Sequence, residues 1–447
     1  MRYLPNTPDD VRAMLEVIGV RAVEDLLTRI PPKARLSRPL QLPAAMAEPD
    51  LLRHLRALAA RNADADGYVC FLGGGAYDHH VPAAIDHLIA RGEFFTAYTP
   101  YQPEASQGTL RTIYEYQTMI AELYGMDVAN ASIYDGASSL AEAALMAHAV
   151  TGRREVVLAA GVHPLYRRVT ATYGAGAGLV LREAPAPEGV LDLDAARRLV
   201  GPATAALVVQ SPNFYGCLED VAAAAEIAHA ADALLVVVSD PVNLGVLEAP
   251  GRLGADLVVG EGQGLGVPLS YGGPYLGTFA ARQAFVRRLP GRLVGATVDV
   301  DGRRGFVLTL QTREQHIRRA RATSNICTNV ALCALMATIY LALLGKAGLR
   351  RVGELSTAKA HYAAARLSEI PGVSLRFAAP FFKEFTLRLP RAPARVVARL
   401  ARERILGGVP LGAFDRRLRD CLLVAVTEKR TREEIDRFAE ALARAVR

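Results

Sequence analysis

The sequence predicts an α/β protein built on a mostly parallel sheet. Five short apolar segments, rich in β-branched residues, follow one another in the middle of the chain, and helical patterns separate several of them. Strands that are apolar along their whole length are buried on both faces, which is typical of a parallel sheet covered by helices. The expected strands are residues 155–160, 178–182, 205–210, 234–239 and 256–260, with a further strand in 274–282.

The chain of 447 residues is predicted to divide into an arm and two domains. Residues 1–90 are expected to form a helical arm, which begins with Thr7 as a cap, Pro8 at the first helical position and acidic residues in the first turn. Such an arm either wraps a partner subunit or packs on its own chain. Residues 91–330 are assigned to the large α/β domain. A bridging helix and a small α+β C-terminal domain are expected in 331–447.

Composition argues against several classes of protein. The net charge is +7, but the basic residues are spread along the chain without an aromatic-interleaved strip, so no nucleic acid partner is expected. The longest apolar run, 331–344, is shorter than the roughly 20 residues that span a bilayer. Five cysteines without disulfide or metal spacing suit reduced thiols in the cytoplasm. His79 and His80 are adjacent and would point apart, so no metal site is predicted.

The glycine-rich segments predict no nucleotide site. Residues 174–178 and 260–266 do not fit the G-x-G-x-x-G pattern, and no lysine follows them as in an ATP-binding loop. The triple glycine 73–75 either lets backbone N–H groups approach an anion or makes a tight turn before a helix in 78–90. The helix start at 135–138 has a geometry that suits phosphate, and it is equally a routine helix cap.

An aromatic segment, residues 91–139, holds six of the sixteen tyrosines. Its first part, 94–106, has two prolines and no helical or strand period, which indicates an ordered loop. Exposed aromatic surface in quantity is unusual on a soluble monomer. The loop is therefore either buried in its own core or part of a shared site. A second feature is the choice of basic residues, because 47 of the 52 are arginine and residues 34–345 contain no lysine.

Three segments carry a resemblance to a known family. They are PDDVRAML at 8–15, the stretch 71–147 that includes YTPYQPEASQGTL, and RATSNICTN at 321–329. All are similar to glycine decarboxylase, the P-protein family of the glycine cleavage system. The resemblance implies a pyridoxal-phosphate (PLP) dependent transferase fold of type I, with a seven-stranded, mostly parallel sheet in the large domain and a small C-terminal domain.

The resemblance also locates the cofactor positions of that fold. An aspartate at a strand end pairs with the pyridinium nitrogen, and here it looks like Asp240. A lysine that carries the cofactor as a Schiff base is expected where Gln263 and Gly264 stand. Only a primary amine forms that bond, so this chain is not expected to hold PLP covalently. Asp240 is then a relic or a cap, and His163, at the position of a ring-stacking residue, is expected to be structural.

The resemblance implies a heteromeric oxidoreductase. In length and content the chain resembles the alpha subunit of the two-subunit form, with a PLP-bearing beta subunit, the lipoylated H-protein and glycine as partners and an α2β2 heterotetramer as the assembly. Together the subunits would release CO2 from glycine and transfer its aminomethyl group to the lipoyl arm. The alternative is a catalytically empty scaffold or regulatory subunit of the same enzyme.

Shared-site residues follow from the same comparison, because pockets of fold type I dimers lie at the subunit interface. The expected contributions are Tyr98, Tyr101, Gln102, Thr323, Ser324 and Asn325. Tyrosine hydroxyls and amides suit hydrogen bonds to a phosphate or a carboxylate. Packing at the interface alone is the alternative for the two tyrosines. Arg313, Arg318 and Arg319 are expected to form a solvated basic face, and the alternative is that they bind a carboxylate.

Overall fold

The computed structural model describes residues 5–36 and 38–447. The chain separates into two compact units, with the division between Asn62 and Ala63. The second unit therefore begins inside the range 1–90 that was predicted as the arm. Phe71 and Ile85 explain the difference, because both are fully buried in cores of the second unit.

The first unit consists of short helices without a buried core. α1 (Pro8–Ile18) starts at Thr7 with a reciprocal capping box to Asp10 and ends at Gly19, which adopts the left-handed conformation. A 3₁₀ helix, η1 (Val23–Leu27), comes next, and the Asp25 carboxylate accepts the backbone N–H groups of Arg21 and Ala22 before it. η2 (Pro32–Ala34) and α2 (Glu48–Ala59) follow.

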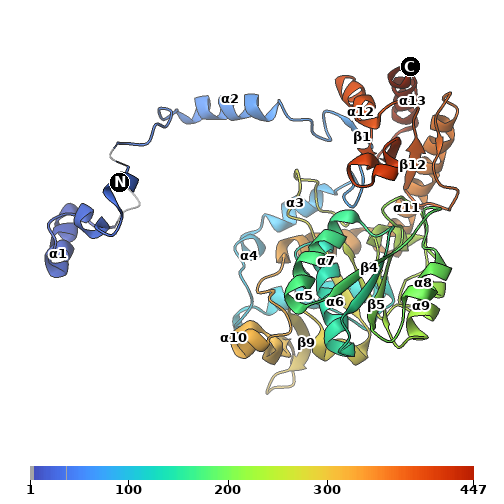
Figure 1. Ribbon diagram of the computed structural model, residues 1–447. Coiled ribbons are helices and arrows are strands. Elements are labelled where there is room, and N and C mark those ends of the chain that lie inside the picture. The colour runs from blue at the N-terminus through green and yellow to red at the C-terminus, as the bar shows by residue number, and fades with distance from the viewer. Residues whose placement is uncertain (1–4, 37) are drawn as a thin grey trace. The chain divides into compact units, whose positions relative to one another are not determined.

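The second unit is organised by a seven-stranded sheet with the order β2-β8-β7-β6-β5-β3-β4 (Figure 1). Its strands are β2 (Val128–Ala129), β3 (Glu155–Ala159), β4 (Val180–Ala184), β5 (Thr204–Gln210), β6 (Leu234–Val238), β7 (Leu257–Glu261) and β8 (Gly277–Ala281). The pairings among β4, β3, β5, β6 and β7 are parallel, whereas β8 runs antiparallel to both of its neighbours. Four of the parallel strands, β3, β5, β6 and β7, are buried almost throughout, which matches their mostly apolar sequence.

Helices cover the sheet. They are α3 (Ala83–Ile89), α4 (Gly92–Phe95), α5 (Gln107–Tyr124), α6 (Gly136–Thr151), α7 (Pro164–Ala177), α8 (Leu193–Leu199) and α9 (Val221–His229). α6 packs against β5 to β8, and α9 packs against β5 and β6. α3 starts five residues later than the predicted helix, because the segment before it is extended and enters the interior of the unit.

A β-hairpin and a loop region were not predicted. β9 (Leu293–Val298) pairs antiparallel with β10 (Arg304–Thr309), and the buried side chains of both strands form a small core with α5. Short turns η3 (Pro103–Ala105), η4 (Pro241–Gly245), η5 (Gln283–Arg288), η6 (Gln311–Arg313), α10 (Gln315–Arg318) and η7 (Arg319–Arg321) complete the domain. The alternation in β10 is between half-buried and buried positions, which is too weak to mark a strand in the sequence.

The C-terminal domain is an α+β layer. Its sheet has the order β11-β12-β15-β14, with β11 (Ser374–Leu375), β12 (Glu384–Arg388), β14 (Val409–Pro410) and β15 (Cys421–Ala425). α12 (Pro393–Arg402) and α13 (Arg432–Val446) cover it, together with η8 (Leu411–Ala413) and η9 (Arg416–Leu418). β1 (Val69–Cys70) pairs with β13 (Ile405–Leu406) and brings Phe71 against Phe438, with ring centroids 4.4 Å apart.

One long helix, α11 (Ala331–Ser368), links the domains. It is the single described helix whose length and composition would suit a membrane span. Gly345 interrupts its helical backbone, however, and divides it into two segments. The first segment buries Ala334, Ala337 and Tyr340 in the main core of this unit, so its apolar character serves internal packing.

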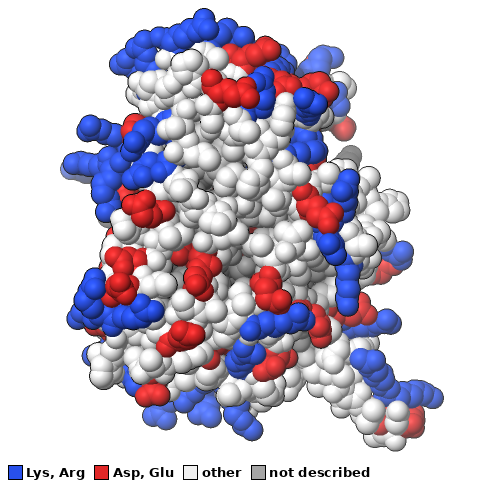
Figure 2. Space-filling model, turned by 90° about the vertical axis from the view of Figure 1, so that its right-hand side faces the viewer, with Lys and Arg blue, Asp and Glu red and all other residues white. Residues whose placement is uncertain are grey.

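Charged side chains are mixed on the surface. On the face shown in Figure 2, Lys and Arg lie among Asp and Glu over most of the molecule and gather most at the end formed by the C-terminal domain.

Replacing Phe438 with alanine tests the C-terminal core. Phe438 is fully buried against Phe71, so the loss of its ring should lower the free energy of unfolding by about 3–5 kcal/mol. Urea unfolding of the isolated chain followed by circular dichroism gives this value. Phe95→Ala is the matched control, because its ring is 67% exposed, and a change within about 0.5 kcal/mol is expected. Equal losses in the two variants would contradict the assignment of this core.

Candidate functional site

The carboxyl edge of the parallel strands forms a closely packed polar pocket. Gln210, Asp240 and Glu261 come from the ends of β5, β6 and β7, and the C-terminal domain contributes two further side chains. The complete lining is Gly75, Tyr77, Tyr166, Gln210, Pro212, Val238, Ser239, Asp240, Glu261, Lys383 and Glu384. The cavity that remains has a volume of about 20 Å³, which is room for about one water molecule.

Gln263, directly before the predicted lysine position, is fixed in the interior. Its amide oxygen accepts the N–H of Tyr77 at 2.8 Å, and its amide nitrogen donates to the carbonyl oxygens of Tyr77 at 3.1 Å and Val267 at 2.7 Å. The side chain is 2% exposed. The glutamine therefore holds the segment around Tyr77 in place.

Gly264 borders the same pocket. A Cβ atom at this position would lie 3.0 Å from Cγ2 of Val242 and 3.1 Å from Cδ2 of His79. Both distances are tight, so a longer side chain would have to displace the imidazole. His79 and Val242 thus leave little space for a side chain at the position where the fold has its lysine.

Asp240 has a partner that the sequence did not predict. One carboxylate oxygen accepts the N–H of Val242 at 3.0 Å, so Asp240 caps η4. A cap was one of the two roles expected for it. The other oxygen, Oδ2, lies 2.5 Å from Nζ of Lys383 as an ion pair without a well-aligned hydrogen bond. Lys383 is 2% exposed and also lies over the Tyr77 ring, 3.5 Å from its centroid.

Lys383 was placed in a strand by the sequence but not in a site. It stands directly before β12, in the sequence FFKEF. A signal was present, because lysine is almost never fully buried unless it is paired, and this one interrupts an apolar run. The partner could not be read from the sequence, since Asp240 lies 143 residues earlier.

A chain of hydrogen bonds continues from Lys383. Its ammonium lies 2.8 Å from Nε2 of His79, and Nδ1 of His79 lies 2.5 Å from Glu428. Lys383 can only donate, so Nε2 accepts and Nδ1 carries the proton toward Glu428. Burial by itself would raise the pKa of Glu428, but hydrogen bonds from His79 and from the His80 N–H lower it to about 2. The neutral imidazole thus connects the Glu428 carboxylate to the ion pair between Lys383 and Asp240.

Glu384 joins the triple-glycine turn to the C-terminal domain. Its carboxylate accepts the Gly74 N–H at 2.7 Å and the Tyr77 hydroxyl at 2.6 Å. Burial raises the pKa of Glu384 to about 7, although both hydrogen bonds oppose the shift. The glycines therefore do let a backbone N–H approach an anion, but the anion belongs to the chain itself. Gly74 and Gly75 take positive φ angles of 77° and 109° there.

His163 is structural in this chain. Nδ1 accepts the Leu165 N–H at 3.1 Å and caps α7, while Nε2 donates to the Gly74 carbonyl at 2.8 Å. Its ring stacks on Tyr166 with centroids 4.6 Å apart. Burial lowers the pKa of His163 to about 4, so the imidazole is neutral at neutral pH.

Glu261 occupies the start of α6. Its carboxylate accepts the N–H groups of Gly136 at 3.0 Å, Gln263 at 3.0 Å and Leu276 at 2.9 Å. Burial raises the pKa of Glu261 to about 7, and the backbone N–H groups partly offset that rise. Asp135 caps the helix through the Ser138 N–H at 2.7 Å. The helix start is therefore a capped terminus filled by a carboxylate from the same chain.

The aromatic loop forms a second, separate group. Tyr98 and Tyr101 are 78% and 50% exposed, and Gln102 is exposed beside them. The hydroxyl of Tyr101 accepts a hydrogen bond of 3.1 Å from Arg292, whose guanidinium also lies 5.4 Å from the centroid of the Tyr101 ring. Arg292 is buried, and its Nε has no hydrogen-bond partner among the described residues. The sequence analysis missed Arg292 because the hairpin that carries it was not predicted.

The predicted residues before α11 lie close to this loop. His316 packs edge-on against Tyr101 with centroids 6.5 Å apart, and its neighbour Gln315 donates to Asn325 at 3.3 Å. Thr323 is half-buried and donates its N–H to the Arg313 carbonyl at 3.0 Å. The aromatic loop and the segment before α11, two of the predicted groups, are thus both in contact with α10.

Ser324 and the nearby arginines complete this region. The Ser324 hydroxyl accepts the Ile326 N–H at 3.0 Å. Burial raises the pKa of Glu142 to about 7, and Ser324 partly offsets it. Arg313 was wrongly assigned to a solvated face, because its guanidinium donates to the carbonyls of Leu289, Gly291 and Leu310. Arg318 and Arg319 are exposed as expected.

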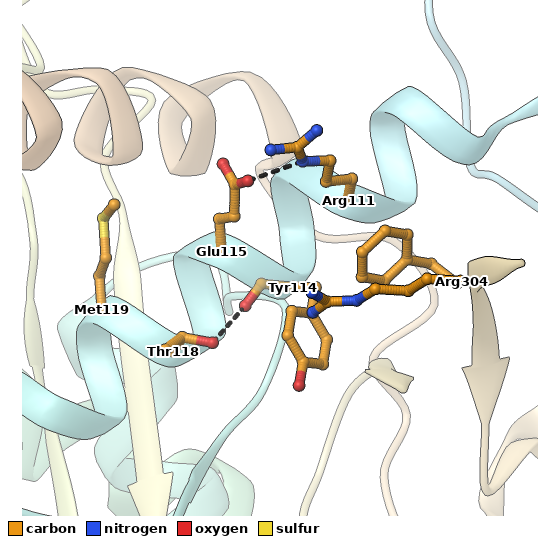
Figure 3. Close-up of a pocket in the computed structure, with 7 residues that line it drawn as sticks. Arg111, Tyr114, Glu115, Thr118, Met119 and Arg304 are labelled. Atoms are coloured by element: carbon orange, nitrogen blue, oxygen red, sulfur yellow. Dashed lines mark hydrogen bonds and ion pairs between the residues drawn. The ribbon is translucent and has the colours of Figure 1, made fainter. Parts of the chain in front are cut away.

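A larger surface hollow on α5 is a weaker candidate. Its volume is about 520 Å³, and it lies between α5 and β10 (Figure 3). The polar side chains there are already paired: Arg111 with Glu115 at 2.8 Å, and the Thr118 hydroxyl with the Tyr114 carbonyl at 2.9 Å. Arg304 lies over the Tyr114 ring, 5.8 Å from its centroid. No polar group converges on the hollow, so it lacks the features of a catalytic site.

The chain matches one protein family over nearly its whole length. Residues 1–442 match the family described as Glycine cleavage system P-protein. The chain belongs to this family. It is 52% identical over 442 residues to the probable glycine dehydrogenase (decarboxylating) subunit 1 of Desulforamulus reducens and of Moorella thermoacetica, and 99% of each chain is covered.

Solved structures agree with this assignment. A crystal structure of glycine decarboxylase (P-protein) of the glycine cleavage system, in inhibitor-bound form, matches with a TM-score of 0.90 and 49% identity over 100% of both chains. Sphingosine-1-phosphate lyase from Burkholderia pseudomallei shares the fold at 19% identity, with a TM-score of 0.67 and 93% and 94% of the two chains covered. The predicted P-protein family, the fold type I architecture and the enzyme class are confirmed.

PLP does not fit the pocket of this P-protein chain. Position 264 has no amine, Asp240 is already paired with Lys383, and the start of α6 holds Glu261. The remaining volume of about 20 Å³ compares with the roughly 300–1,000 Å³ of typical ligand pockets. The amine of Lys383 lies against the carboxylate that would face the pyridinium nitrogen.

Replacing Glu384 with glutamine tests the charge state of this pocket. Since burial raises the pKa of Glu384 from 4.5 to about 7, the unfolded chain releases this proton first as the pH rises. The stability that the protonated group contributes is present below pH 4.5 and is lost as the pH passes 7. The glutamine does not titrate, so the variant does not lose stability in this way. The free energy of unfolding of the variant, minus that of wild type, should therefore increase by about 3 kcal/mol between pH 4.5 and pH 8.

Urea unfolding at the two pH values gives the difference. Glu440→Gln, at an exposed position of α13, is the control and should differ from wild type by the same amount at both. A Glu384→Gln difference that does not change with pH would show that the carboxyl is ionised throughout.

Proposed function

We propose that this chain completes an active site whose PLP is held covalently by a second subunit of decarboxylating glycine dehydrogenase. The observation that carries the proposal is a contrast between two groups of residues predicted for a site in this chain. The pocket at the strand ends is filled internally, whereas Tyr98, Tyr101 and Gln102 are exposed at the surface. The relatives are named subunit 1, which implies a second subunit.

The exposed tyrosines are suited to a neighbour's pocket. Their rings leave a large apolar area open to solvent, and such area is normally covered in an assembly. The Tyr101 hydroxyl is oriented by Arg292, because the guanidinium both donates to the oxygen and lies against the ring. A hydroxyl that accepts from a cation is polarised and is a better donor to a carboxylate or phosphate on its other side.

The proposed reaction breaks the bond between the α-carbon and the carboxylate of glycine. CO2 leaves, and PLP held by the partner subunit would supply the electron sink for the electron pair of the broken bond. The aminomethyl carbon then bonds to one sulfur of the lipoyl disulfide of the H-protein, whose other sulfur is reduced to a thiol. This chain contributes orientation and hydrogen bonds through Tyr98, Tyr101 and Gln102, with Thr323, Ser324 and Asn325 from the adjacent segment.

The assembly follows from the same reasoning. We infer an α2β2 heterotetramer in which each pair of unlike chains shares one working pocket. The cytoplasm is the proposed location, since the five cysteines are free and four of them are buried. The first unit, residues 5–62 apart from residue 37, has apolar side chains exposed on α1 and α2 and is available to contact a partner subunit.

Replacing Tyr101 with phenylalanine tests the shared site. In the complex reconstituted with the partner and the H-protein, the exchange of the glycine carboxylate with bicarbonate should fall about tenfold or more, because one hydrogen bond to a charged group is lost. Tyr98→Phe and Gln102→Ala should also reduce the exchange. Tyr173→Phe, on the surface of α7, is the control and should leave it unchanged. Unchanged exchange in all three site variants would favour an empty scaffold.

Borohydride reduction locates the cofactor. When the complex with PLP is reduced and digested, we expect the labelled lysine in the partner subunit and none in this chain. Mass spectrometry of the peptides identifies the site. A label on this chain in stoichiometric amount would contradict the division of labour between the subunits.

A further inference from the structure

We propose that side chains of this chain take the place of a cofactor in its own pocket, with Lys383 as the internal cation, Glu261 as the internal anion and Tyr166 as the internal ring. The pocket is then a permanent structural joint between the domains that excludes PLP. This inference concerns the chain's own strand-end pocket and does not depend on the shared site proposed above.

The cationic element is the best defined. PLP presents a protonated pyridine nitrogen to a carboxylate, and in this pocket the carboxylate of Asp240 faces the ammonium of Lys383 at 2.5 Å. The ammonium is further held by Nε2 of His79 at 2.8 Å and by the face of Tyr77 at 3.5 Å. A buried aspartate without such a partner would carry an uncompensated charge.

The anionic element lies at the start of α6. A phosphate group is attracted to a helix N-terminus because the backbone N–H groups and the helix dipole favour negative charge. Here the Gly136 N–H donates to Glu261 at 3.0 Å, and the same carboxylate takes two further backbone N–H groups. Glu261 thus supplies, from within the chain, the negatively charged group that this helix N-terminus favours.

An aromatic ring completes the lining of the pocket. Tyr166 lines the pocket and stacks on His163 with an interplanar angle of 25°. A Cβ at Gly136 would lie 2.5 Å from the Tyr166 hydroxyl, so the ring extends as far as the start of α6. Ring, cation and anion together reduce the free volume to about 20 Å³.

The arrangement joins segments that are distant in the sequence. Lys383 and Glu428 belong to the C-terminal domain, Asp240 ends a strand of the large domain, and His79 lies on the segment before α3. Each charge in this series touches one of the opposite sign or a hydrogen-bond partner. Removing Lys383 therefore affects the attachment of the C-terminal domain as well as the pocket.

Lys383→Ala in the full-length chain is the first test. The loss of the ammonium leaves Asp240 buried without a counter-charge, and the melting temperature should fall by about 5 °C or more. The atoms removed correspond to propylammonium. Propylammonium chloride should therefore raise the melting temperature of this variant by several degrees relative to the same concentration of tetramethylammonium chloride.

Two controls isolate the effect. Lys346→Ala, at an exposed position of α11, should melt as wild type does and should gain nothing from propylammonium. Wild-type chain mixed with PLP and reduced with borohydride should carry no adduct on Lys383 and should show no shift in melting temperature. A Lys383→Ala variant that melts within 1 °C of wild type, or that propylammonium does not stabilise, overturns the proposal, as does a stoichiometric Lys383 adduct.

A paired substitution covers the case in which Lys383→Ala does not fold. Lys383→Met combined with Asp240→Asn removes both charges and keeps the volume of the pocket. This double variant should melt at a higher temperature than Lys383→Met alone, because no unpaired charge remains. A double variant that melts no higher than the single one would show that the two residues are not coupled, and the internal-cation role would be wrong.

Discussion

The ion pair between Lys383 and Asp240 is the contact on which the arrangement of the second unit depends. The Lys383 side chain is 2% exposed, and a carboxylate, an imidazole and an aromatic face surround its amine and compensate the cost of burying it. His79 in turn makes a hydrogen bond to Glu428, which follows β15. The strand ends of the large domain and the sheet of the C-terminal domain are thereby joined by one buried polar chain.

In the proposed arrangement this joint lets a fold type I chain of the P-protein family do without a cofactor of its own. A strand end with a carboxylate and a helix start with free N–H groups both require compensation when they are buried. Lys383 and Glu261 provide it from within the chain. On this proposal the pocket serves packing, and the exposed tyrosines serve the site of a partner.

A filled pocket and an open surface with predicted site residues also fit the proposed role of this chain, which is to complete the site of a partner subunit. Tyr101 is held by Arg292 from the β9–β10 hairpin, and Asn325 is linked to the same region through Gln315. These residues come from three separate segments and meet only in the folded chain. A surface assembled in this way is suited to a partner's pocket rather than to an independent site.

The sequence by itself determined the strand segments of the mostly parallel sheet and the absence of a Schiff-base lysine, because burial on both faces and a missing amine are both local properties. The sequence also indicated the loop with Tyr98 and Tyr101, but the order of the strands and the exposure of this loop came from the tertiary structure. Only the tertiary structure decided what fills the space near Asp240, since Lys383 lies in another domain and the pairing depends on how β12 meets the end of β6. Likewise, the partner of the α6 start was decided by the packing of Glu261, which has no signature along the chain.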